Sequence, residues 1–323
     1  MIQLIRPCLK QLLATGIAFR VLALILLTPT LSLIFRIAFA IAGESALADF
    51  DILDFLISPT GIICTILNLA VQLAFSVMEI AAFLSIIDAS AHHKNATTVG
   101  AVRFALNHGW RILRQTTMVV TALLLIGLPF ALVGGLVFYV LTRQYDINYY
   151  LAQRPTEWWI ALLILGLLAA VAAAIYLRVL AGWIYALPRL LFKDESPRQA
   201  LTRSRLAVTG IRKKIVIILA VWLFAAILTH GLVLATLVWL GSLVIPQAGD
   251  AMYLLLPITG AFLAIWFISS ELINLFAKIA LAAIIYQQFT QVESTDQESI
   301  PAYLTSMAVP AMHGNWYLTP VRL

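Results

Sequence analysis

Six long apolar stretches dominate the chain, and short polar segments separate them. The stretches cover residues 17–42, 60–88, 117–142, 158–187, 215–245 and 255–288. Because a helix needs about 20 apolar residues to cross the hydrocarbon layer of a membrane, each stretch predicts a membrane-spanning helix. Every stretch exceeds that minimum, which indicates helices that tilt, kink or extend beyond the bilayer. The pattern therefore predicts an all-α polytopic transmembrane bundle of about six spans.

Two of the polar segments carry helical patterns of their own. In residues 96–115, Thr97 and Thr98 are both possible N-caps of a helix whose apolar positions recur at helical spacing. In residues 195–214, Ser196 can act as the N-cap, and Pro197 occupies the first helical position. Both segments mix apolar and basic side chains. The sequence therefore predicts two amphipathic interfacial helices on the cytoplasmic side of the membrane.

These two segments match in register at an offset of 99 residues. Thr97 aligns with Ser196, and Ala101 aligns with Ala200. Each segment follows an inward-running span and precedes an outward-running one. Two interpretations fit this match, namely a duplicated three-span unit and a chance similarity between apolar sequences of low complexity.

The two ends of the chain differ from its apolar middle. Residues 1–16 have apolar side chains at helical spacing and no acid, which predicts an amphipathic segment on the cytoplasmic membrane surface. Residues 289–323 are polar and contain three prolines, which predicts a disordered cytoplasmic tail. Residues 17–288 between them would form the six-span membrane domain.

Composition supports the assignment to a membrane. The chain has 323 residues, of which 62% are hydrophobic and 11% charged, whereas soluble domains have about 25% charged residues. The mean hydropathy is +0.97. A soluble core of this size cannot bury so much apolar surface, so the sequence predicts an integral membrane protein.

Charge is distributed unevenly between the two sides of the predicted bundle. Fifteen bases fall within residues 1–20, 89–116 and 188–214, whereas the loops on the other side carry Arg143, Arg154 and seven acids. Cytoplasmic loops are enriched in Lys and Arg, so both termini are expected in the cytoplasm. The same asymmetry accounts for most of the net charge of +6, and no nucleic-acid partner is expected.

Several ionisable residues fall inside the predicted spans. Glu79 and Arg178 are separated by the same offset of 99 residues, and both lie about 13–15 Å from the basic ends of their spans. An isolated charge at that depth costs about 3 kcal/mol, so we expect the two to pair, with Lys278 as a rival partner for Glu79. His230 and Glu271 are expected to form a second buried pair. Such groups either line a polar pathway or substrate site, or fix the register of the helices.

The basic segments offer candidate contacts for lipid. Each base near the membrane surface adds about 1 kcal/mol of attraction to anionic headgroups, and the alternative is that these bases only set the topology. The candidates are Arg103, Arg111, Arg114, Arg198, Arg203, Arg205, Arg212, Lys213 and Lys214.

The chain carries no recognisable catalytic, metal or cofactor motif. His92 and His93 are adjacent, but no set of Cys, Asp and Glu ligands near them would complete a metal site. Phosphate-binding glycine loops and the Gly-x-Ser-x-Gly elbow are both missing from the sequence. We therefore expect no metal, no cofactor and no catalytic residue.

Several segments resemble the N-terminal membrane domain found on some bacterial glycerophosphodiester phosphodiesterases. The resemblance covers roughly residues 20–290, and its loops carry it best. The segments that carry it are PTLSLIFRIAFAIAGESALADFDILDFLISPTGI, MEIAAFLSIIDAS, VRFALNHGWRIL and WIYALPRLLFKDESPRQALTRSRLAVTGIRKK.

The resemblance implies a catalytic barrel C-terminal to the membrane part, with a His-Arg-Gly segment, a Glu-Asn pair and a divalent metal. The three His-Gly dipeptides, which begin at His108, His230 and His313, lack the arginine. The residues after the sixth span are far fewer than the roughly 250 of such a barrel. The resemblance therefore implies a homologue of the membrane domain without phosphodiesterase activity in this chain.

Together these observations lead to two functional hypotheses. The first is a non-catalytic, lipid-interacting or anchoring module of the bacterial inner membrane, which acts in glycerophospholipid metabolism and assists a partner enzyme in trans. The alternative is a small permease for an amphiphilic or phosphorylated solute, in which the buried charges would line a hydrated route.

Overall fold

The computed structural model describes residues 5–42, 58–94, 96–145, 147–245 and 252–299. Helices make up nearly all of these ranges, and the described residues contain no strand. The elements are η1 Arg6–Cys8, α2 Leu9–Leu22, the π-helical η2 Ala23–Leu27, α3 Thr28–Ala42, α5 Pro59–Ala91, α6 Thr98–Asn107, α7 Gly109–Thr142, α8 Ile147–Gln153, α9 Thr156–Gly182, α10 Ala186–Phe192, α11 Pro197–Ala207, α12 Arg212–Val244 and α13 Met252–Ser299.

Six helical segments are long and apolar enough to cross a membrane. The all-helical, six-span prediction is thus confirmed, and the observed spans generally extend further than the predicted ones. They are Arg6–Ile34, Pro59–Ala91, Gly109–Thr142, Thr156–Phe192, Arg212–Val244 and Leu255–Glu293.

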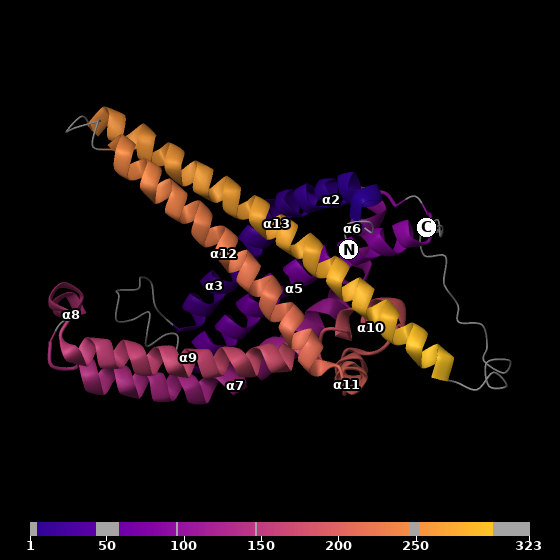
Figure 1. Cartoon of the computed structure of the whole chain (residues 1–323), viewed down its shortest axis with the longest axis horizontal. Coiled ribbons are helices and arrows are strands. Elements are labelled where there is room, and N and C mark those ends of the chain that lie inside the picture. The colour runs from indigo at the N-terminus through magenta and orange to yellow at the C-terminus, as the bar shows by residue number, and fades with distance from the viewer. Residues whose placement is uncertain (1–4, 43–57, 95, 146, 246–251, 300–323) are drawn as a thin grey trace.

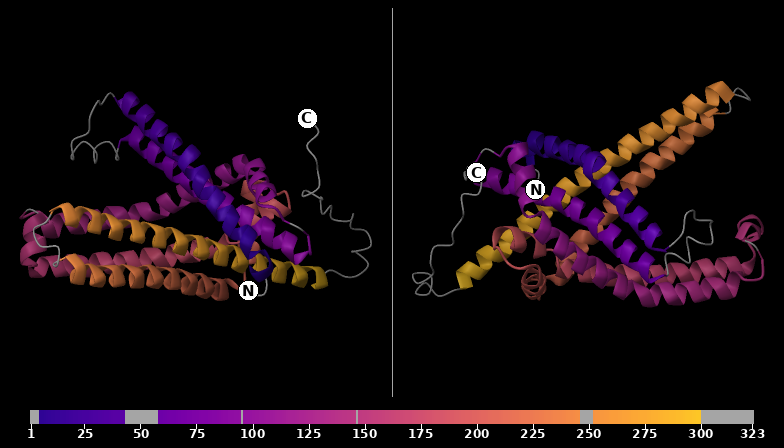
Figure 2. Two further views of the ribbon diagram at one scale, coloured as in Figure 1. Left: turned by 90° about the horizontal axis from the view of Figure 1, so that it is seen from above. Right: turned by 180° about the vertical axis from the view of Figure 1, so that it is seen from behind.

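The spans form three pairs that converge at one end of the molecule. Figure 1 shows α12 beside α13 and α7 beside α9, and α3 runs against α5. The pairs meet where α2, α6, α10 and α11 gather, and their other ends diverge (Figures 1 and 2). The most apolar part of α5 is 56% buried, whereas none of the corresponding part of α7 is. Helix α5 is therefore the central helix, and the outer helices present most of their apolar surface to their surroundings.

Of the candidate N-caps, Thr97 and Ser196 are confirmed, and Thr98 is the first residue of its helix. The Thr97 side chain accepts a hydrogen bond from the Gly100 N–H at 3.1 Å, and α6 begins at the next residue. Ser196 and Gln199 form a capping box at the start of α11. Caps satisfy backbone N–H groups that the first helical turn leaves unpaired, which is why these polar residues set the helix starts. The placement of α6 and α11 on a membrane surface stays a prediction.

Helix α9 ends at Gly182, inside the stretch that the sequence predicts as one span. The Trp183 N–H bonds to the Leu180 carbonyl, and α10 begins only at Ala186. Ser204 of α11 closes this break, because its hydroxyl donates to the Gly182 carbonyl at 2.9 Å and accepts from the Tyr185 N–H at 3.1 Å. Backbone groups freed by the break are thereby paired in a buried place.

A long helix, a capped short helix and a long helix follow one another twice along the chain, and the second time the additional short helix α10 stands before the capped one. Helix α6 starts at residue 98 and α11 at residue 197, which is the offset of 99 residues found in the sequence. Buried positions also recur at this offset, as expected for a duplicated unit. The buried pairs are Ile86 and Tyr185, Ala101 and Ala200, Ala105 and Ser204, Thr116 and Ile215, and Val120 and Leu219.

The described parts of the two terminal segments are helical. Leu12 and Phe19 of α2 are fully buried, and α2 packs against α5 and α6 rather than lying apart as a surface segment. Helix α13 continues to Ser299, so residues 289–299 of the expected disordered tail are helical. Residues 300–323 of that tail lie outside the described residues.

Candidate functional site

Four ionisable side chains from three helices form a network around one buried carboxylate, and its other three members are partly exposed. Glu79 of α5 is fully buried, and its Oε2 lies 2.6 Å from Lys278 Nζ of α13. The same oxygen lies 3.3 Å from an Arg20 guanidinium nitrogen of α2. Arg20 Nε in turn lies 2.6 Å from Glu271 Oε2 of α13. The network therefore runs Glu271–Arg20–Glu79–Lys278 and alternates in charge.

Alternation of charge lets this network exist inside an apolar bundle. An unpaired charge in a membrane interior costs several kcal/mol, and paired, hydrogen-bonded charges recover most of that cost. Two acids and two bases leave the network electrically neutral. It also ties α2 and α13 to the central helix α5, so it fixes the packing of three elements at once.

The structure changes two of the pairings expected from the sequence. Glu79 does not pair with Arg178; Lys278, the rival partner, contacts it instead. Glu271 pairs with Arg20 and not with His230. Packing explains the first change, since α5 lies against α2 and α13 whereas α9 lies against α7 and α12.

Arg20 is the site residue that sequence reasoning missed. It stands at the end of the basic N-terminal segment, where it counts as one of the topology-setting bases. The available signal was its place inside a continuous helical span from Arg6 to Ile34, which puts it among apolar neighbours rather than in a loop.

His230 forms no ion pair with the charge network or with any other described residue. Its Nδ1 is 2.8 Å from the Ala226 carbonyl, and its ring meets the Trp266 ring edge-on at 6.4 Å between centroids. It lines a pocket of about 560 Å³ between α12 and α13. Lys278 lines the same pocket, so one member of the network is accessible from this side.

Arg178 lies near one end of α9 rather than deep in the bundle. It stands four residues before Gly182, where α9 ends, or about 6 Å along the helix axis. Counting to the end of the predicted span places it deeper, because the break after Gly182 is not visible in the sequence. Its side chain is exposed and makes no ion pair with any residue that the structure describes.

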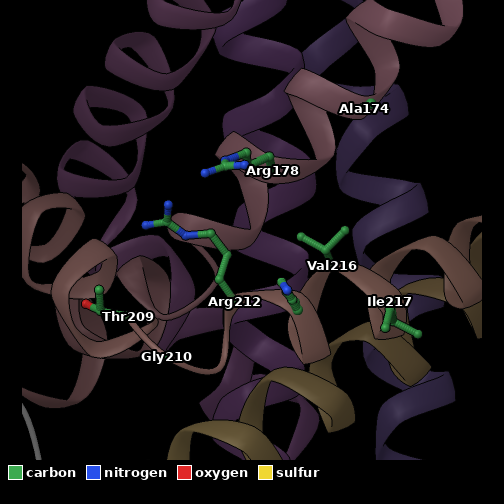
Figure 3. A pocket seen from close by; sticks show the side chains of 8 residues that line it. Ala174, Arg178, Thr209, Gly210, Arg212, Val216 and Ile217 are labelled. Carbon is green, nitrogen blue, oxygen red and sulfur yellow. The ribbon is translucent and has the colours of Figure 1, made fainter.

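Arg178, Arg212 and Lys213 line a pocket of about 770 Å³ between α9 and α12. Figure 3 shows the guanidinium groups of Arg178 and Arg212 near each other and extended toward the same side. Ala174, Val216, Ile217, Thr209 and Gly210 complete the lining, which contains no acid.

The other candidate lipid-binding bases fall into two groups. Three are engaged within the protein: Arg111 pairs with Asp194, Arg203 lies 2.8 Å from Glu195 Oε1, and Arg205 stacks over the Trp183 ring at 4.9 Å. The second group is exposed and has no ion pair within the described part of the chain. Its members are Arg103, Arg114, Arg198 and Lys214.

Metal-binding geometry is missing from the described residues. No three side chains of His, Cys, Asp or Glu gather there in a way that could hold an ion. Asp88 is engaged instead with Tyr286, whose hydroxyl donates to it at 3.1 Å, and lies 3.5 Å from His92 Nδ1. The two pockets present bases that can bind anionic groups.

Comparison with known protein families matches residues 1–313 to the membrane domain of glycerophosphoryl diester phosphodiesterase. No curated protein and no solved structure matches the chain. The family match covers the six spans, the charge network and the basic pocket.

Proposed function

Since the chain belongs to the family of membrane domains of glycerophosphoryl diester phosphodiesterases, we propose that it is a non-catalytic module that gathers anionic glycerophospholipid at one membrane surface. It would do so in the bacterial inner membrane, with both termini in the cytoplasm, and would assist a partner enzyme of glycerophospholipid turnover in trans.

One observation carries this proposal: the exposed bases without acidic partners lie on the elements at the converging end of the bundle. Arg103 of α6, Arg114 of α7 and Arg198 of α11 are all exposed, with no ion pair to any described residue. Unneutralised bases attract anionic headgroups, by about 1 kcal/mol each near a membrane surface. The nearby acids Asp194 and Glu195 pair with Arg111 and Arg203 and leave these three bases unneutralised. A role in topology alone does not require that arrangement.

Lipid enrichment tests the proposal directly. The purified full chain is reconstituted into vesicles of phosphatidylethanolamine and phosphatidylglycerol, extracted, and analysed for co-purified lipid. We expect phosphatidylglycerol to be enriched over its bulk share, and the triple variant Arg103→Gln/Arg114→Gln/Arg198→Gln to lower that enrichment by about threefold or more. The matched control is Arg143→Gln/Arg154→Gln at the opposite end, which should leave the enrichment unchanged.

Two results would contradict the proposal. Equal lipid ratios in the extract and in the bulk membrane would remove the lipid-gathering role. Hydrolysis of a glycerophosphodiester by the purified chain would remove the non-catalytic role.

A specific contact favours the alternative, a permease for an amphiphilic or phosphorylated solute. Lys278 belongs both to the buried network and to the pocket of about 560 Å³ between α12 and α13. A solute anion entering this pocket would meet the amine and compete with Glu79 for it. Uptake of a radiolabelled phosphorylated solute into proteoliposomes, lost in Lys278→Gln, would establish this second function.

A further inference from the structure

We infer that the pocket between α9 and α12 binds the phosphate group of one anionic glycerophospholipid, with the lipid's acyl chains against the apolar wall of the same pocket. This inference deepens the proposed function and rests on it. It assigns a discrete, single-lipid site, whereas the proposed function needs only a general attraction at the surface.

The positive charge of the pocket, which no acidic side chain neutralises, is the first observation that supports a phosphate site. Arg178, Arg212 and Lys213 line the pocket together, and none of them forms an ion pair with a described residue. Arg212 Nε is buried and has no hydrogen-bond partner among the described residues. Two guanidinium groups that lie near each other repel unless an anion stands between them or beside them. A phosphate has several acceptor oxygens and suits this pair because guanidinium groups bind it bidentately.

The backbone adds to the same positive potential. Gly210 adopts a left-handed conformation with φ +96°, which residues with a Cβ rarely adopt, and the turn ends where α12 begins at Arg212. The start of a long helix carries a partial positive charge and free N–H groups. The turn therefore brings the start of α12 and the Arg212 side chain to the same pocket.

The apolar wall distinguishes a lipid from a small soluble anion. Ala174, Val216 and Ile217 line the pocket, away from the two guanidinium groups (Figure 3). One turn further along the same faces, Val171 and Val221 are 52% and 62% exposed. A volume of about 770 Å³ also exceeds what a phosphate group fills. An anionic head with apolar chains matches both parts of the lining.

Arg178 explains why the site would hold a lipid at the membrane boundary. It lies about 6 Å from the end of α9, where an arginine can extend toward the headgroup layer. Its charge in contact with hydrocarbon alone would be costly, so it needs water or an anion beside it. A lipid phosphate supplies that anion at the depth where phospholipid phosphates lie.

Native mass spectrometry of the full chain, released from vesicles of phosphatidylethanolamine and phosphatidylglycerol, tests the inference. We expect one tightly held phosphatidylglycerol in the wild type, and at least about tenfold lower occupancy in Arg178→Gln/Arg212→Gln, because two charge-assisted contacts are lost. Arg178→Lys keeps the charge and should retain most of the occupancy. Arg143→Gln, an exposed position at the other end of the spans, serves as the control and should leave the bound copy in place.

A competition experiment distinguishes a lipid phosphate from the phosphate of a soluble phosphodiester. Glycerophosphoglycerol carries the same phosphodiester without acyl chains, so it should displace the bound lipid only weakly, even at millimolar concentration. Displacement at concentrations equal to those of short-chain phosphatidylglycerol would overturn the lipid assignment and favour a soluble phosphodiester.

The outcomes separate this inference from the proposed function. Unchanged occupancy in the folded double variant, together with general enrichment of phosphatidylglycerol, would overturn the discrete site and leave the proposed function standing. Absence of any enrichment in the wild type would contradict both. Circular dichroism and the elution volume in gel filtration show whether each variant is folded.

Discussion

At the scale of single residues, depth along a helix could be predicted from the sequence, but neighbours could not. Counting residues identifies Glu79 and Lys278 as charges inside spans, and both belong to the observed network. Counting says nothing about which side of a helix faces which partner. The pairing of Glu79 with Lys278 rather than Arg178 therefore depends on how α5, α9 and α13 pack, and that information is not local in the sequence.

Removal of the central acid should destabilise the bundle. Glu79→Gln leaves Lys278 and Arg20 facing each other without their shared carboxylate. Breaking a buried pair on one side costs about 3 kcal/mol or more, because the remaining charge stays desolvated. Equilibrium unfolding in mixed detergent micelles, followed by circular dichroism, should show this loss.

The double variant Glu79→Gln/Lys278→Gln provides the control for that prediction. It removes one charge of each sign, so it should be more stable than Glu79→Gln alone. Equal stability of the two variants would show that Lys278 is not the functional partner of Glu79 in the folded state.

At the scale of elements, the starts of two short helices could be predicted from the sequence, but the break between α9 and α10 could not. The caps of α6 and α11 depend on residues within one helical turn, so Thr97 and Ser196 identify them from the sequence alone. The break after Gly182 depends instead on Ser204, which is more than twenty residues away and bonds to both sides of the gap. An apolar sequence that continues through a break gives no local sign of it.

Ser204→Ala should therefore destabilise the junction of α9, α10 and α11. It leaves the buried Gly182 carbonyl and the Tyr185 N–H without their side-chain partner. Unsatisfied buried polar groups cost about 1–3 kcal/mol each, so we expect a loss of about 2 kcal/mol or more in unfolding free energy.

Ser242→Ala is the matched control for this prediction. Ser242 is an exposed serine whose hydroxyl bonds to the Trp239 carbonyl of its own helix. Its removal should change stability little, and comparable losses in the two variants would contradict a special role for Ser204.

At the scale of the whole molecule, the number of spans and the asymmetry of charge followed from composition and pattern. The divergence of the three helix pairs in Figures 1 and 2 could not be predicted in this way. The apolar side chains on α7, α9 and α12 form the same sequence pattern whether they face protein or lipid. The exposed bases lie on the elements at the converging end of the bundle. In the proposed function, this end faces the membrane surface that carries the anionic lipid.

Orientation can be tested with single cysteines in a Cys8→Ser/Cys64→Ser background. Gln144→Cys and Thr202→Cys stand at exposed positions toward opposite ends of the spans. By the positive-inside rule, a membrane-impermeant maleimide should label Gln144→Cys in intact cells and Thr202→Cys only after the membrane is opened. Labelling in the reverse order would place the basic end outside and contradict the proposed location.

The offset of 99 residues relates Glu79 to Arg178, two equivalent positions with opposite charge and different surroundings. In the first half the position lies in a closed network, and in the second it lines an open pocket. A duplicated gene allows this outcome, because one copy can conserve the ancestral scaffold while the other accumulates changes. The two halves of this protein would then have diverged within a single chain. The first half would have kept a structural role for this position, and the second half would have acquired a ligand-binding role.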